Sequence, residues 1–253
     1  MTVAVVGPAD PLEMLNAAGA PLSALPTGHR VGSSPAAAGT PRPGSMQEER
    51  TAIATEPQVT VEAGLPGTLR DSPDRRALEL LNYIVGVPSY GGRLGWALTK
   101  VGLTYSSSAT TTFGATTGHI VFSTKCDTRN LEATIQAIRE IVAGVGDRGV
   151  DDWELQEAKA FTFGRTLLYG TREDSGEEAI ASALLDSELS GEELLDLPAF
   201  SRNYLAVTLD QVNAAAKRYY RPELLKVVAV GAIPARPGKS QYPAGTFRAL
   251  FER

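Results

Sequence analysis

The chain has 253 residues, of which 43% are hydrophobic and 21% are charged, and its formal net charge is −5. This composition is typical of a soluble globular protein, and the acidic balance argues against a nucleic-acid partner, whose phosphates need clustered Lys and Arg. No apolar run approaches the roughly 20 residues of a membrane-spanning helix. The single cysteine, Cys126, excludes an internal disulfide framework. Since the start of the chain also lacks the features of a signal peptide, we expect a cytoplasmic protein with no membrane segment.

The first 48 residues divide into two parts. The apolar run at residues 2–7 predicts a strand, and Asp10-Pro11 predicts the N-cap and first position of a helix that Gly19 closes. Residues 1–19 are therefore interpreted as a strand–helix remnant of a preceding domain. Residues 20–48 are rich in Pro, Gly and Ala, cannot bury a core, and are interpreted as a linker.

Residues 49–235 predict one domain with the element order β-β-α-α-β-β-α-α-α-α-β. Period-two alternation or short apolar runs predict strands at 51–55, 58–63, 103–112, 119–124 and 225–231. Capping residues and apolar stripes predict helices that begin at Ser72, Arg93, Asp127, Asp151, Ser175 and Thr208. The first two strands are expected to pair with each other. The sequence leaves open a further short helix at residues 194–204, and residues 236–253 are interpreted as a C-terminal tail. Such an order predicts an α+β fold, a largely antiparallel sheet with its helices packed on one side.

The residues that a hydrolytic metal site needs are missing. A catalytic zinc ion takes three protein ligands and a neighbouring general base. The chain has two histidines, His29 and His119, ninety positions apart, and neither has a Glu at a helical interval. Cys126 and His119 lie seven apart in one predicted strand, on opposite faces, so a Cys–His pair is not expected. The sequence predicts no catalytic residue and no metal site.

Seven stretches carry a family resemblance in the same order along the chain. They are Arg93-Leu94 and residues 64–74, 77–84, 101–106, 149–159, 207–217 and 227–231. With them, residues 51–233 resemble the C-terminal domain of the pitrilysin/insulinase family of zinc metallopeptidases, which includes mitochondrial processing peptidase. The resemblance implies a LuxS/processing-peptidase-like metallohydrolase fold. Residues 3–11 are similar to the end of the domain that precedes it in that family.

The resemblance implies a non-catalytic subunit of a heterodimeric zinc peptidase. Such a subunit closes half of a substrate chamber, binds extended peptide, and works with a catalytic H-x-x-E-H subunit that holds the zinc, so no cofactor is expected in this chain. Tyr105 matches a family tyrosine that contacts substrate, whereas the family arginine seven residues before it falls on Leu98. Arg93 matches a separate family arginine, and Gly91 and Gly92 resemble a short counterpart of a glycine-rich substrate loop. The implied substrate-binding residues are thus Tyr105, Arg93, Gly91 and Gly92.

Alternative interpretations stay open from the sequence. Tyr105 could instead be a strand tyrosine whose hydroxyl finds a local partner, and the two glycines could form a tight turn that leads into a helix. The scaffold could also serve a metal-free biosynthetic enzyme, with Tyr105 and Arg93 as acid–base candidates. A third possibility is a homodimeric peptide-binding protein.

Overall fold

The computed structural model describes residues 2–26, 48–53, 56–86, 92–169, 177–190, 202–233 and 238–251. The chain divides into two compact units, of which one comprises residues 1–36 and 160–206. The other comprises residues 37–159 and 207–253 and is here called the sheet unit, because it contains the five described strands. Helix α5 crosses from the sheet unit into the first unit.

The strands are β1 (Glu48–Ala52), β2 (Val59–Pro66), β3 (Thr104–Phe113), β4 (Gly118–Cys126) and β5 (Lys226–Gly231). The helices that begin in the sheet unit are α2 (Arg75–Gly86), α3 (Gly92–Leu94), η1 (Gly95–Thr99), η2 (Thr128–Asn130), α4 (Leu131–Arg148), α5 (Asp152–Tyr169), α8 (Leu209–Tyr219), η3 (Pro222–Leu224) and η4 (Arg248–Phe251). The first unit contains α1 (Pro11–Ser23) and α6 (Glu177–Ser190).

The sheet has the strand order β1-β5-β2-β4-β3, and only the β1–β5 pair is parallel. The expectation that the first two strands pair with each other is wrong, because β5 lies between them. The burial of β1 and β5 gives the reason. In β5, Val227 and Ala229 are buried, which suits an inner strand, whereas β1 begins with Glu48, Glu49 and Arg50, and charged side chains suit an edge.

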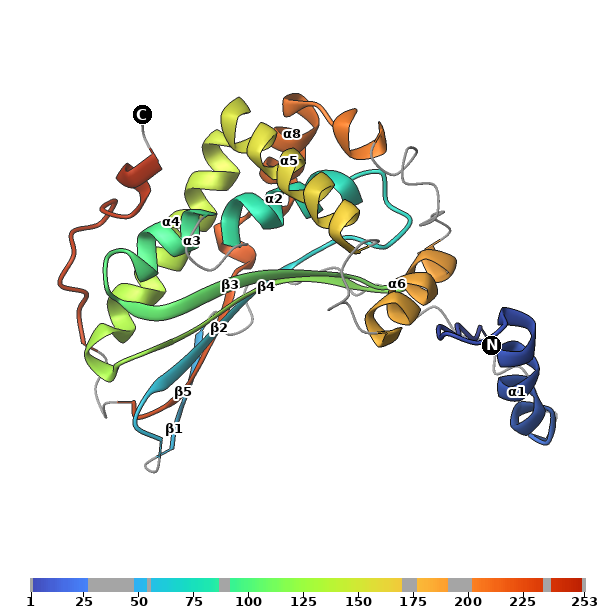
Figure 1. Cartoon of the computed structure of the whole chain (residues 1–253). Coiled ribbons are helices and arrows are strands. Elements are labelled where there is room, and N and C mark those ends of the chain that lie inside the picture. The colour runs from blue at the N-terminus through green and yellow to red at the C-terminus, as the bar shows by residue number, and fades with distance from the viewer. Residues whose placement is uncertain are drawn as a thin grey trace. The chain divides into compact units, whose positions relative to one another are not determined.

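One face of this sheet carries the core. Val59, Val61, Ala63 and Leu65 alternate along β2 and are all buried. Helices α2, α4 and α8 lie over that face (Figure 1). No helix of the described sheet unit covers the opposite face, here called the uncovered face (Figure 1). The predicted α+β class, with a largely antiparallel sheet and helices on one side, is confirmed.

Helix α4 shows what the sequence could and could not place. Its predicted stripe of Leu131, Ile135, Ile138 and Val142 is buried throughout. The predicted end at Gly144 is wrong, because the helix continues to Arg148 and stops at Gly149, whose φ of 76° is the left-handed conformation that glycine adopts easily at a C-cap.

Helix α5 buries a different face from the predicted one. The sequence predicts an apolar stripe of Trp153, Ala160, Leu167 and Leu168; the first two are exposed, and the side chains of the last two lie outside the described part of the chain. In the first turns, Leu155 and Ala158 are buried instead. The start is as predicted, since the backbone N–H of Asp151 donates to the Glu154 carboxylate at 2.8 Å, half of a capping box. The box holds Glu154 against the core, so the neighbouring Trp153 points outward.

The N-terminal segment confirms one prediction and contradicts two. The carboxylate of Asp10 accepts the N–H groups of Leu12 and Glu13, at 2.9 and 3.2 Å, so the predicted cap is present. The helix continues past Gly19 to Ser23, into the predicted linker, and residues 27–47 of that linker lie outside the described residues. Residues 2–7 form no strand, because no described strand pairs with them and an unpaired strand leaves its backbone groups unsatisfied.

The described part of the C-terminal segment packs on α4. Phe247 is completely buried, and the Glu140 carboxylate accepts the backbone N–H groups of Gly245, Phe247 and Arg248 at 2.7, 2.8 and 3.1 Å. One carboxylate on α4 therefore anchors the described segment from residue 238 to residue 251.

This anchor is expected to weaken in acid. Burial alone would raise the pKa of Glu140, but the hydrogen bonds from Gln136 and from the three backbone N–H groups outweigh burial and lower the pKa. A lowered folded-state pKa stabilises the fold above the unfolded value, and that stabilisation is lost as the pH falls through the folded value. Acidification from about pH 6 to about pH 3 should therefore cost the wild type more stability than it costs Glu140→Gln. Urea denaturation at each pH measures the difference, and equal acid sensitivity of the two proteins would contradict the anchor.

Candidate functional site

Tyr105 lies at a β-bulge on edge strand β3, which pairs only with β4 among the described strands. The register of that pair shifts between Thr104 and Ser107. These two side chains are buried, whereas Tyr105 and Ser106 between them are both exposed, as expected where an extra residue interrupts the alternation. The Tyr105 side chain is 83% exposed, and its hydroxyl has no partner among the described residues. The bulge thus presents a free phenol at the end of the sheet.

The uncovered face combines many polar side chains with the apolar side chains of Val121, Val228 and Val230. Alternation along the strands places on it the side chains of Glu62, Ser108, Thr110, Thr112, Ser123 and Lys125. Glu62 pairs in register with Ser123, and Ser123 pairs with Ser108. A surface of hydroxyls and charges of both signs suits contact with water and with the polar backbone of a peptide.

Arg93 belongs to the helical layer. It follows Gly92, whose φ is 64°, and a side chain at Gly92 would press on the carbonyl groups of Ile84 and Val85 at 3.0 Å. The Arg93 guanidinium is buried and donates to both carboxylate oxygens of Glu154, from Nε at 2.9 Å and from Nη2 at 2.8 Å. This bidentate pair joins α3 to α5.

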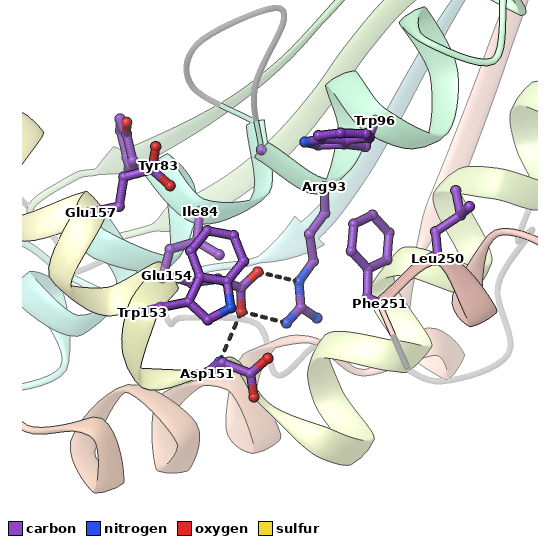
Figure 2. Close-up of a pocket in the computed structure, with 11 residues that line it drawn as sticks. Tyr83, Ile84, Arg93, Trp96, Asp151, Trp153, Glu154, Glu157, Leu250 and Phe251 are labelled. Carbon is purple, nitrogen blue, oxygen red and sulfur yellow. Dashed lines mark hydrogen bonds and ion pairs between the residues drawn. The ribbon is translucent and has the colours of Figure 1, made fainter. Parts of the chain in front are cut away.

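A cavity of about 480 Å³ adjoins this ion pair (Figure 2). Its walls come from α2, α3, η1, the first turns of α5 and η4, and they include Tyr83, Trp96, Trp153, Glu157 and Phe251. Burial of the Tyr83 phenol and the nearby charge of Glu157 raise the pKa of Tyr83. The sequence analysis missed this cavity. One feature of the sequence could have indicated the cavity: each of the two tryptophans lies within three residues of Arg93 or Asp151.

The structure does not bring the implied substrate-binding residues into one site. Tyr105 projects into solvent, Arg93 is turned toward Glu154, and Gly91 lies outside the described residues. Leu98, at the position of the family arginine, is fully buried. Substrate contact by Tyr105, Arg93, Gly91 or Gly92 stays a prediction.

The described residues contain no group of three or more His, Cys, Asp and Glu side chains that could hold a metal ion. His119 is exposed, whereas Cys126 on the same strand is buried, and this burial raises the pKa of its thiol. The two side chains thus face opposite sides, as their spacing indicates. Within the described part of the chain, no helix has the length and apolar character required to cross a bilayer.

Comparison with known proteins gives a consistent result. Residues 1–161 match the family model described as the peptidase M16 inactive domain. A peptidase M16 inactive domain from Pseudomonas fluorescens has a TM-score of 0.66 and 22% identity, over 77% of this chain and 45% of that one. A protease from Helicobacter pylori has a TM-score of 0.61 and 14% identity, over 76% and 45%. An inactive peptidase domain from Bordetella parapertussis has a TM-score of 0.54 and 20% identity, over 74% and 97%.

The coverage differs between these structures. The chain spans less than half of the length of the first two and nearly all of the third. At these identities the similarity shows a shared fold. No curated protein matches the chain.

Proposed function

The chain belongs to the peptidase M16 family as an inactive-domain member, and we propose that it is the non-catalytic half of a zinc peptidase. In this role it forms one side of a chamber that holds an extended peptide. A catalytic subunit with an H-x-x-E-H motif forms the other side and supplies the zinc. The observation that carries the proposal is the uncovered face of the sheet, bordered by an edge strand with an exposed tyrosine.

Edge strand β3 supports peptide binding by strand addition. Its only described partner is β4, so the backbone groups of its other edge are available to a further strand. An extended peptide can pair with such an edge through main-chain hydrogen bonds. The free hydroxyl of Tyr105 can then donate to a peptide carbonyl.

The need for a partner rests on the ligands that this chain can offer. A catalytic zinc ion takes three protein ligands and a water. The chain has two histidines and one cysteine. His29 lies outside the described residues, His119 is exposed on the sheet, and the Cys126 thiol is buried. The proposal therefore assigns the zinc, its ligands and the general base to the partner.

Reconstitution tests the proposal. When the chain is co-expressed with a catalytic H-x-x-E-H protein encoded beside it, we expect the two to elute as one complex in size exclusion. Peptide cleavage should require both chains and should stop when 1,10-phenanthroline removes zinc. Cleavage by this chain alone that survives the chelator would contradict the proposal and favour a metal-free enzyme. A stable homodimer with no complex would favour a peptide-binding protein.

Tyr105 gives a second test on the same complex. Tyr105→Phe removes only the hydroxyl, and since one hydrogen bond contributes about 1–1.5 kcal/mol, kcat/KM should fall roughly tenfold. Tyr242→Phe is the matched control, because Tyr242 lies in the C-terminal segment and packs on Phe247 with ring centroids 5.1 Å apart. Unchanged kcat/KM in Tyr105→Phe would exclude a hydrogen bond from Tyr105 to the substrate.

A further inference from the structure

The cavity beside the Arg93–Glu154 pair is unusually rich in exposed aromatic surface. The chain has two tryptophans, and both line this cavity. Trp96 is 51% exposed and Trp153 is 64% exposed, although indoles are normally well buried. Phe251 and Leu250 add apolar surface on the side of η4 (Figure 2). The residues that dominate the binding energy at a protein interface are often tryptophans that lie in or around a pocket.

The charge of the cavity favours a cation. Its charged lining residues are Arg93, Asp151, Glu154 and Glu157, one positive against three negative. Arg93 and Glu154 neutralise each other, so Asp151 and Glu157 remain as two exposed carboxylates at the cavity. No described residue forms an ion pair with either of them.

Two contacts already present show how these walls bind cations. The Lys100 ammonium lies 3.1 Å from the ring centroid of Trp96, although Lys100 is not itself a lining residue. The Arg93 guanidinium lies 5.3 Å from the ring centroid of Phe251 while it pairs with Glu154. An aromatic face on one side and a carboxylate on the other is the environment that a guanidinium favours, because it is planar and weakly hydrated.

We propose that this cavity binds an arginine side chain from a segment of a partner protein, with an apolar residue next to the arginine. The guanidinium stacks on the indoles and pairs with the carboxylates of Asp151 and Glu157, and the apolar neighbour covers Leu250 and Phe251. Arginine suits the site better than lysine, because an ammonium is more strongly hydrated and cannot stack. The cavity lies in the helical layer, away from the uncovered face, so this site is separate from the proposed peptide surface.

Intrinsic fluorescence tests the proposal directly, because both tryptophans of the chain line the cavity. The probe is the peptide acetyl-Leu-Arg-Leu-amide, and its counterpart with citrulline keeps the shape but loses the charge. We expect a saturable change in tryptophan emission with the arginine peptide, at a dissociation constant on the order of 1 mM or lower. The citrulline peptide should bind at least about tenfold more weakly. The same dissociation constant for both peptides, or no saturable change, would overturn the proposal.

Variants and a small cation complete the test. Asp151→Asn together with Glu157→Gln should weaken binding of the arginine peptide roughly tenfold. The charge-matched control, Glu49→Gln with Asp210→Asn, changes two exposed carboxylates outside the cavity and should leave binding unchanged. Agmatine carries the guanidinium without a peptide and should bind more weakly than the arginine peptide. Equal binding of agmatine would exclude a partner segment as the ligand. None of these outcomes depends on zinc, on a catalytic subunit or on cleavage.

Discussion

Arg93→Met is expected to lower the free energy of unfolding by about 3–5 kcal/mol, because it leaves the Glu154 carboxylate buried without its cation. Both side chains are almost fully buried, and their bidentate hydrogen bonds span 61 positions of the chain. Glu154→Gln should cost a similar amount, since it leaves the guanidinium of Arg93 buried and unpaired. Urea denaturation monitored by circular dichroism measures both losses.

The double variant separates the unpaired charge from the loss of packing. Arg93→Met with Glu154→Gln removes both charges of the buried pair, and the glutamine oxygen can still accept the N–H group of Asp151 that bonds to Glu154 in the wild type. The double variant should therefore be more stable than either single variant, with a coupling energy of about 1–3 kcal/mol. Strictly additive losses would show that the two side chains stabilise the fold independently. The control Arg129→Met removes an exposed ion pair with Asp127, 3.6 Å apart, and should cost less than about 1 kcal/mol.

Leu98→Arg is expected to destabilise the protein by roughly 3–5 kcal/mol, although it introduces the arginine that the family resemblance implies seven residues before the tyrosine. Leu98 is completely buried in η1, and its carbonyl accepts the N–H group of Leu103 at 2.9 Å, where the chain turns toward β3. The one buried carboxylate among the described residues, that of Glu154, already pairs with Arg93, so an arginine at position 98 would place an uncompensated charge in the core.

Leu98→Met is the matched control for size, and it should cost less than about 1.5 kcal/mol, because it conserves volume and apolar character. Thermal denaturation of the two variants gives the comparison. If Leu98→Arg were as stable as Leu98→Met, an arginine at this position would be able to reach solvent, and the family pair of arginine and tyrosine could be rebuilt here. The expected loss instead implies that the proposed substrate contact of Tyr105 does not involve an arginine at position 98.

Much of the local structure could be predicted from the sequence. The cap at Thr208 is one example, since its hydroxyl accepts the N–H group of Gln211 at 3.2 Å and its own N–H donates to the Gln211 side chain at 2.9 Å. The apolar alternation of β2 and the stripe of α4 are others. These features depend on residues three or four positions apart or on alternation along one strand, and such short-range rules can be read from the chain directly.

The candidate sites were harder to predict. The Tyr105 side chain is exposed because of the bulge between Thr104 and Ser107, and a bulge is defined by the register against β4, which the sequence does not specify. The sequence pattern places Trp153 on the apolar stripe of its helix, because an indole contributes strongly to any apolar pattern. The structure instead buries Glu154 with Arg93 and leaves Trp153 at the edge of a cavity.

The sequence by itself determined where most elements begin, which face of β2 is apolar, and that the two histidines form no zinc-peptidase motif. These properties follow from side-chain chemistry and short-range spacing. Only the tertiary structure decided that β5 lies between β1 and β2, that Arg93 pairs with Glu154, and that the two tryptophans share one cavity. These features are contacts between distant residues, and many arrangements of the same elements satisfy the local rules until the packing of the whole core selects one.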